Sequence, residues 1–350
     1  MLKRAFALSD QGAKDLAKGI IATACANLIQ IIPASLLLMV VMMLLEKAAG
    51  THVNVGRNIP VFVGITLVLF GMIAITQLVQ YNLTYTAAYK ESANRRIVLA
   101  EKLRKLPLSF FEKKNLADLT TTIMGDCTAL ERTFSNAIPQ LLGTILMFVI
   151  TSVGLAVLDW RMALCIIVPV PVASIVVVLA RKAQSKAELE NLEAKRCAYD
   201  AVQEYVDTIK ELKAYSKTNV YLDELDKKLE NVIRCSFRNE LAPGASTTAA
   251  QFILRFGLVA VLLIGGKLVI EGTLSIPMLI LFLLFAGRIY DPFTNCFMLL
   301  AEVFAALVSI GRMKQIDNTQ EQTGSDCYNN IGYDIEFKDV HFSYNEEPVL

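Results

Sequence analysis

Six stretches of this sequence are long and apolar enough to cross a lipid bilayer as helices. A bilayer core about 30 Å thick needs roughly 20 apolar residues of helix. The six stretches are 19–45, 59–83, 138–158, 162–180, 252–270 and 276–300. Hydrophobic residues make up 54% of the 350 residues, above the share that is usual in soluble domains. We therefore predict an all-α membrane protein with six transmembrane helices.

Lysine and arginine are divided unevenly among the connections between these stretches. The connection 84–137 holds nine and the connection 181–251 holds twelve, whereas the other three hold two or fewer each. Positively charged connections remain in the cytoplasm. This asymmetry predicts a multi-pass protein of the cytoplasmic (inner) membrane, with both termini and both long connections in the cytoplasm.

The two long connections keep the periodicity of helices rather than that of loops. Residues 187–215, "AELENLEAKRCAYDAVQEYVDTIKELKAY", are rich in strong helix formers. An extension of about 25 residues at about 1.5 Å rise reaches roughly 37 Å beyond the membrane. We therefore predict two long helical extensions, which is more reach than a simple link between spans needs.

Each extension must reverse at a tip, and a short transverse helix is expected at each tip, where aromatic residues occur. Pro107 should end the incoming helix of the first extension, and Ser109 should cap a short helix after it. Such transverse tips are suited to mechanical coupling with a cytoplasmic motor. The candidate coupling residues are Phe110, Phe111, Tyr215 and Tyr221. Alternatively, each aromatic residue packs between the helices of its own extension.

The N-terminal segment "LSDQGAKDLAKGII" offers Ser9 or Asp10 as a helix cap. Lys14 and Lys18 give the following turns an amphipathic character, which predicts a short helix along the inner membrane surface before the first span. The alternative is a simple basic flank of that span.

The sixth apolar stretch contains two charged residues, Arg288 and Asp291. Arg288 lies about 18 Å along the helix from Ile276, and Asp291 follows on the same face. Charges within a membrane are costly and often mark a functional site. We predict that this face lines a substrate cavity in which Arg288 contacts an anionic group. The alternative is an internally paired Arg288 and Asp291 beside a kink at Pro292.

The composition argues against two other kinds of site. Seven scattered cysteines and two histidines form no metal-ligand cluster, so no metal is expected. The net charge of +1 provides no basic field, so no nucleic-acid partner is expected.

The C-terminal residues change character. Residues 318–332 are polar and read as a linker, and "YDIEFKDVHFSY" then alternates apolar and polar residues as a half-buried strand does. Residues 333–350 are therefore expected to form a short β segment after the helical domain 1–317.

The chain as a whole resembles the transmembrane domain of an ATP-binding-cassette (ABC) half-transporter of the exporter type. The resemblance rests on the six spans, the two extensions, and the motifs "LPLSFFEKKNLADLTTTIMGDCTALE", "EYVDTIKELKAYSKT" and "RIYDPF". It implies that residues 333–350 are the first strand of a truncated nucleotide-binding domain, in which Tyr344 stacks on adenine. It also implies ATP and Mg²⁺ as cofactors of the complete transporter.

The implied function is ATP-driven movement of a small molecule, peptide or lipid-like substrate by alternating access. The implied partners are the lipid bilayer, a second half-transporter in a homodimer or heterodimer, a nucleotide-binding domain and an unidentified substrate. No G-x-x-x-x-G-K-[ST] phosphate loop, Walker B or signature motif occurs in these 350 residues, so this chain by itself is expected to bind no cofactor and not to hydrolyse ATP. Two alternatives are an importer of iron–siderophore complexes on the same fold, and a non-catalytic membrane scaffold or partner subunit.

Overall fold

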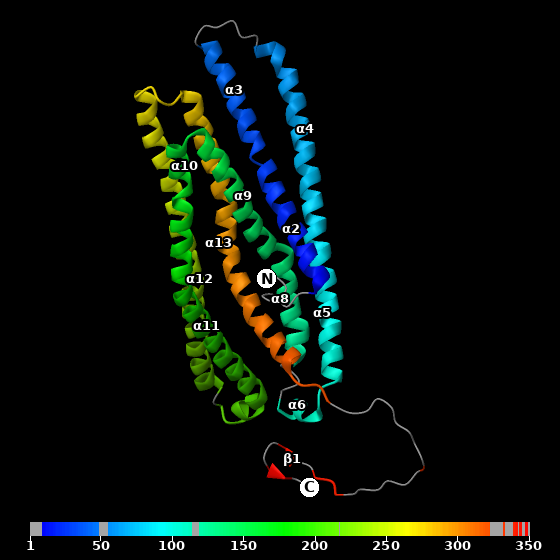
Figure 1. Ribbon diagram of the computed structural model, residues 1–350. Coiled ribbons are helices and arrows are strands. Elements are labelled where there is room, and N and C mark those ends of the chain that lie inside the picture. The colour runs from blue at the N-terminus through cyan, green and yellow to red at the C-terminus, as the bar shows by residue number, and fades with distance from the viewer. Residues whose placement is uncertain are drawn as a thin grey trace. The chain divides into compact units, whose positions relative to one another are not determined.

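A computed structural model of the chain describes residues 9–48, 55–113, 119–216, 218–322, 332, 339–341, 343–344 and 347–348. These residues are almost entirely helical (Figure 1). The chain divides into two compact units, which we describe separately. Residues 20–79 and 140–301 form one, here called the span unit, and residues 1–19, 80–139 and 302–350 form the other, here called the arm unit.

Six helical segments among the described residues are long and apolar enough to cross a membrane. They are Gln11–Met43, Pro60–Arg104, Thr121–Leu158, Trp160–Ala214, Tyr221–Ile270 and Ile276–Asn318. The prediction of an all-α fold with six transmembrane helices is therefore confirmed, and the chain is a multi-pass membrane protein.

The N-terminal helix differs from the sequence prediction. Helix α2 (Asp10–Ile29) runs on without a turn, and Ser9 caps it by accepting a 2.9 Å hydrogen bond from the Gly12 N–H. The expected separate surface helix is therefore wrong. The break falls instead before α3 (Ile32–Ala48), where Pro33 lacks the N–H that would continue the helix.

The first extension is built from helices with π-helical turns. Helix α4 (Val55–Tyr81) continues through η1 (Asn82–Thr86) into α5 (Ala87–Arg104). The short helix α6 (Leu108–Lys113) follows Pro107. The returning elements are η2 (Thr121–Asp126), α8 (Cys127–Arg132), η3 (Thr133–Ala137) and α9 (Ile138–Leu158).

Pro107 ends the incoming helix as predicted, but Ser109 is not the cap of α6. The Pro107 carbonyl accepts a 3.0 Å hydrogen bond from the Phe110 N–H, so the capping position falls on the proline and Ser109 lies inside the helix. Ser109 cannot cap α6 because the helix already begins at Leu108, directly after Pro107.

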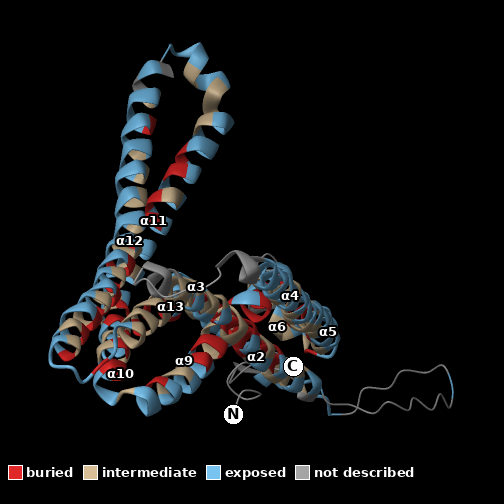
Figure 2. Ribbon diagram, turned by 90° about the horizontal axis from the view of Figure 1, so that it is seen from above, coloured by how far each residue is buried: buried red, intermediate tan, exposed pale blue. Residues whose placement is uncertain are grey.

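The second extension is a hairpin of two long helices. Helix α11 (Pro169–Ala214) has 46 residues and α12 (Thr218–Ile270) has 53, and Figure 2 shows them side by side. At about 1.5 Å per residue their lengths are roughly 70 and 80 Å. Both helical extensions predicted from the sequence are thus confirmed.

The tip of the second extension lacks the short transverse helix that we expected. Among the residues described there, Tyr215 and Ser216 form a turn, and Ser216 has a left-handed backbone with φ of 53°. The chain therefore reverses in a few residues between the two long helices. Only the first tip carries a separate helix in the described part of the chain.

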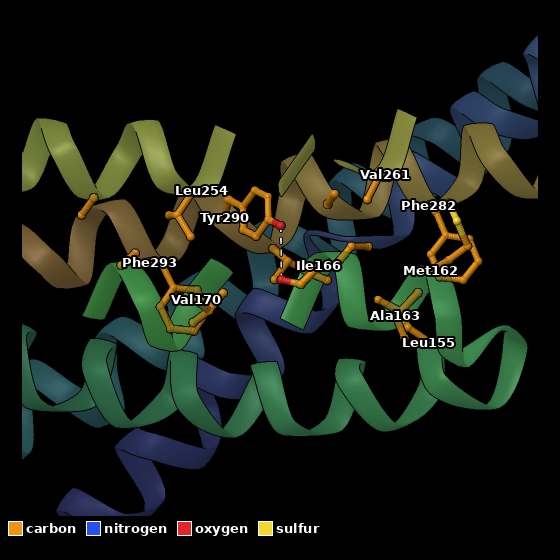
Figure 3. Close-up of a cluster of buried hydrophobic side chains, with 14 of the residues drawn as sticks. Leu155, Met162, Ala163, Ile166, Val170, Leu254, Val261, Phe282, Tyr290 and Phe293 are labelled. Carbon is orange, nitrogen blue, oxygen red and sulfur yellow. Dashed lines mark hydrogen bonds between the residues drawn. The ribbon is translucent and has the colours of Figure 1, made fainter. Parts of the chain in front are cut away.

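The core of the span unit lies where α10 (Trp160–Ile167), α11, α12 and α13 (Ile276–Asn318) meet (Figure 3). Met162, Ile166, Val261 and Phe282 are fully buried there. Asp159 caps α10 by accepting hydrogen bonds from the N–H groups of Arg161 (2.8 Å) and Met162 (3.3 Å). This cap explains how a single residue between α9 and α10 makes a tight hairpin.

Two short strands follow the helices. β1 (Ser343–Tyr344) pairs antiparallel with β2 (Glu347–Pro348). Most of the remaining segment 333–342, which we predicted as a strand, lies outside the described residues.

Candidate functional site

The exposed face of α13 carries a stripe of polar side chains within the span unit. Arg288, Asp291 and Asn295 are all exposed and follow one another at spacings of three and four residues, so they share one face of the helix. We call these three residues the polar stripe. Asn295 was not among the sequence candidates, although its position seven residues after Arg288 could have indicated it.

The opposite face of α13 is fixed in the core. Phe282, Ala286, Ile289, Tyr290 and Phe293 are all buried there. These positions repeat at helical spacing, so burial of this face turns the polar stripe away from the core of the unit.

Two contacts of this buried face set the rotation of α13 about its own axis. The Tyr290 hydroxyl donates a 3.2 Å hydrogen bond to the Ile166 carbonyl, as Figure 3 shows. The Phe293 ring packs edge-on against Phe148 with 5.1 Å between the ring centroids. Both contacts are directional, so the orientation of the stripe follows from the core rather than from the stripe itself.

The structure does not show the ion pair that Arg288 and Asp291 were spaced to form. Neither side chain forms an ion pair or hydrogen bond within the described part of the chain. An exposed pair three residues apart gains only a few tenths of a kcal/mol, and the order Arg before Asp is the less favourable one. Both charges are therefore available to water, a ligand or another protein surface.

Charges on an exposed face of a membrane helix need polar surroundings, such as water, a ligand or a polar protein surface. An arginine or aspartate at the centre of a membrane helix costs about 2.5–3.5 kcal/mol on insertion scales. A face with two charges and an amide is consequently poorly suited to lipid, and it is well suited to an aqueous cavity.

Another polar group in the span unit has a structural role. Asn27 of α2 is only 8% exposed, and its amide nitrogen donates a 3.3 Å hydrogen bond to the Thr144 hydroxyl of α9. A Cβ added to Gly143 would lie 2.8 Å from the Thr23 Cβ, so the two helices approach closely here. Asn27 therefore joins two spans, as polar residues between membrane helices commonly do.

The first tip exposes apolar side chains at α6. The rings of Phe110 and Phe111 lie edge-on with centroids 5.5 Å apart, and Phe111 is exposed. Leu108 is 85% exposed and was not among the sequence candidates. Helix α6 therefore presents exposed apolar side chains in the described part of the first tip.

The two tyrosines of the second extension behave differently from each other. Tyr221 donates a 3.0 Å hydrogen bond to the Ala201 carbonyl and stacks on Tyr205, so it packs within its own hairpin. Tyr215 is 78% exposed at the end of α11. The geometry therefore leaves Tyr215 accessible to a partner at this tip, whereas Tyr221 is engaged in the alternative role considered from the sequence.

A polar contact ties the residues that follow α13 to the end of α5. The Lys102 ammonium lies 3.0 Å from the Glu321 carboxylate, and the Gln322 N–H donates a 2.8 Å hydrogen bond to the Lys105 carbonyl. The hydrogen bond from Lys102 and the nearby charges of Lys102 and Lys105 hold the pKa of Glu321 below its ordinary value, although partial desolvation opposes them.

Acidification should release this contact. Because the folded pKa of Glu321 is lowered, the Lys102–Glu321 pair should be intact above the ordinary glutamate pKa and lost as the pH falls through the lowered value. The measurement is the carboxylate chemical shift of Glu321 in the unaltered chain, followed against pH by NMR with Glu-selective carbon labelling. The Glu321→Gln variant should lack this signal and its pH-dependent step, which assigns both to Glu321. An unchanged shift profile after Lys102→Met would contradict the assignment.

The contacts described above do not test the prediction that Tyr344 stacks on adenine. The backbone of Tyr344 lies in β1, but its side chain lies outside the described part of the structure, so adenine stacking stays a prediction. The described residues also include no group of three or more His, Cys, Asp or Glu placed to hold a metal ion.

Comparison with known proteins identifies the class to which this arrangement of spans and extensions belongs. The model of the ABC transporter transmembrane region matches residues 16–293. The match covers more than half of the chain, and the chain therefore belongs to this family.

Several curated proteins are similar to the chain. An ATP-dependent lipid A-core flippase from Desulfotalea psychrophila is 21% identical over 73% of this chain and 45% of its own length. A lactococcin-G-processing and transport ATP-binding protein from Lactococcus lactis is 24% identical, over 70% and 35% respectively. An alpha-hemolysin translocation ATP-binding protein from Escherichia coli O157:H7 is 30% identical, over 41% and 21%. The chain thus spans less than half the length of each of these relatives.

Proposed function

We propose that this chain is the membrane domain of an ATP-driven exporter that works as a dimer with a second membrane domain. The family membership and the flippase, transport and translocation roles named for the relatives support this proposal. A nucleotide-binding domain that uses ATP and Mg²⁺ would supply the drive in the complete transporter. The proposed location is the cytoplasmic membrane, with both termini in the cytoplasm, as the distribution of lysine and arginine predicts.

The observation that carries the proposal for this chain is the unpaired polar stripe on α13. Arg288, Asp291 and Asn295 lie on an exposed face of a membrane span, and the core fixes that face in place. In a dimer such a face becomes the wall of a central aqueous cavity, and Arg288 would contact an anionic group of the substrate. Alternating access of this cavity would then move the substrate across the membrane.

The tips of the two extensions would transmit the motion of the nucleotide-binding domains. Phe111 and Tyr215, together with Leu108, present the exposed side chains that a docking surface needs. Phe110 would support Phe111 through their edge-on contact, and Tyr221 would hold the second hairpin together. The boundaries of this proposal are a membrane domain over residues 1–317, a linker over 318–332 and the start of the nucleotide-binding domain over 333–350.

Solvent access to the stripe tests the proposal. Single cysteines at Arg288, Asp291 and Asn295 should react with a membrane-impermeant maleimide in proteoliposomes, because the reactive thiolate forms in water and not in lipid. A cysteine at Leu263, an exposed apolar residue of α12, is the matched control and should stay unlabelled. Equal protection of all four positions would mean that the stripe faces lipid or protein, and it would contradict the cavity.

A further inference from the structure

The part of α13 beyond the span unit carries polar side chains that pair with the first extension. All of these contacts lie within the arm unit and join residues about 170 or more positions apart in sequence. The pairs, in order along α13, are Glu302 with Arg132, Ser309 and Arg312 with Asp126, and Asp317 with Arg95. The Glu302–Arg132 pair, at 4.0 Å, is an ion pair without a hydrogen bond. The contacts of Glu321 and Gln322 with α5 continue the series. We call this series the polar ladder.

The order of the partners shows that the ladder follows the helix. As α13 runs from Glu302 to Arg312, its partners run back from Arg132 to Asp126. From Asp317 onward the partners run forward along α5, from Arg95 to Lys102. The residues Arg95 and Lys102 are seven apart, so they share one face of α5. Such a regular order identifies one extended interface with a defined alignment.

Asp126 is the centre of the ladder. Its side chain is 5% exposed, and it accepts a 2.9 Å hydrogen bond from the Ser309 hydroxyl and a 2.8 Å hydrogen bond from Arg312 Nε. A second guanidinium nitrogen of Arg312 also donates to the carboxylate. A forked contact of this kind fixes both distance and orientation, and removal of one partner leaves a buried charge without compensation.

Apolar contacts alone would not fix this alignment. Ile310, Met313 and Ile316 are buried on the same stretch of α13, but the hydrophobic effect is non-directional. Beside them lies a cavity of about 370 Å³, lined on one side by Phe110 and Leu119 and on the other by Arg312 and Ile316. The polar contacts beside this hollow are directional, so they specify the axial position of the helix more sharply than apolar contacts do.

We propose that the polar ladder fixes the axial position, or register, of residues 302–318 of α13 against the first extension. We call this a register lock, with Asp126 and Arg312 as its positioning residues. Sliding α13 by one residue moves each of its side chains by about 1.5 Å and turns it by about 100°, which separates the fork of Arg312 from Asp126. Residues 302–318 of α13 and the first extension must therefore move together, or the contacts of the polar ladder break. Transmission of this motion from a nucleotide-binding domain rests on the proposed function, whereas the lock itself does not.

A distance measurement within this chain tests the lock without nucleotide or substrate. Spin labels at the exposed positions Ile97 on α5 and Val308 on α13 report the alignment in lipid nanodiscs, with the exposed native cysteines replaced. The unaltered ladder should give one narrow distance distribution. Arg312→Glu places two negative charges together and should broaden the distribution or add a second population.

Hydrogen exchange supplies an independent readout of the same lock. In Arg312→Glu the amide of Gln322 should exchange at least about tenfold faster, since hydrogen bonds to charged groups typically contribute more than one factor of ten. Amides within α5 should keep their protection, which distinguishes a released lock from a generally unfolded arm.

Three further variants make the outcome decisive. Arg104→Glu reverses an exposed charge of α5 whose ion-pair partner among the described residues is Glu101 on its own helix, and it should leave distance and exchange unchanged. Arg312→Gln alone should loosen the ladder, and adding Asp126→Asn should restore the narrow distribution through neutral hydrogen bonds. An unchanged distance in both Arg312 variants, or equal broadening in Arg104→Glu, would overturn the lock. Neither result bears on whether the stripe lines a cavity, so the two proposals can fail separately.

Discussion

Replacing Gly257 with alanine is expected to destabilise the span unit by about 1–3 kcal/mol, which is typical of overpacking in a close-packed core. A Cβ at this position would lie 2.2 Å from the Tyr290 hydroxyl oxygen and 2.8 Å from the Pro169 Cγ. Both neighbours are stiff and belong to other helices, so α12 must move away or the Tyr290–Ile166 hydrogen bond must break. Thermal unfolding in nanodiscs, followed by tryptophan fluorescence, measures the loss.

The same helix offers a matched control for this prediction. Outside the adjacent backbone of α12, no atom of the described residues lies within 4 Å of a Cβ added to Gly266, so Gly266→Ala should be neutral or stabilising by up to about 1 kcal/mol through helix propensity. Adding Tyr290→Phe to Gly257→Ala removes the closest clash and should recover part of the loss. If Gly257→Ala and Gly266→Ala melted at the same temperature, the close approach of α12 to Tyr290 would be wrong.

Reversing the charge of Arg288 should invert the preference of the proposed cavity between anionic and cationic ligands. A charged hydrogen bond contributes about 1.5–3 kcal/mol, which corresponds to about 10- to 150-fold in affinity. We therefore expect Arg288→Ala to weaken binding of an anionic fluorescent amphiphile by at least about tenfold. Arg288→Glu should bind a cationic amphiphile of the same size more tightly than the unaltered chain does. Fluorescence anisotropy in nanodiscs gives both affinities.

Arg255 provides the comparison for this prediction. It is an exposed arginine of α12, in a different span, and it is not part of the polar stripe. Arg255→Ala should leave both affinities unchanged, because this charge is not part of the polar stripe that is proposed to bind the ligand. An equal loss in Arg255→Ala and Arg288→Ala would show that net charge, and not the stripe, controls binding.

The spans and the extensions could be predicted because each depends on a property of one segment. Twenty or more apolar residues can satisfy their backbone in lipid only as a helix, so the bounds of α9 (Ile138–Leu158) agree with the predicted span. The ends of helices were less accessible to prediction. The break after Ile29 depends on Pro33, and the turn at Ser216 depends on how two long helices meet.

The candidate site was only partly predictable for a related reason. Arg288 and Asp291 stand out in an apolar stretch, whereas the uncharged Asn295 is less conspicuous, and only the buried face of α13 shows that all three side chains are exposed. Tyr215 and Tyr221 look equivalent in the sequence. Only the packed hairpin shows that Tyr221 is bonded to Ala201 while Tyr215 remains exposed.

The sequence by itself determined that this chain is a six-span helical membrane protein with two long extensions, because hydrophobicity and helix propensity act over neighbouring residues. The tertiary structure alone decided which face of each helix is buried, that Gly257 is needed for a close approach, and that Asp126 meets Arg312 across 186 positions. Such long-range pairings depend on the three-dimensional path of the whole chain, and no local pattern of residues encodes them.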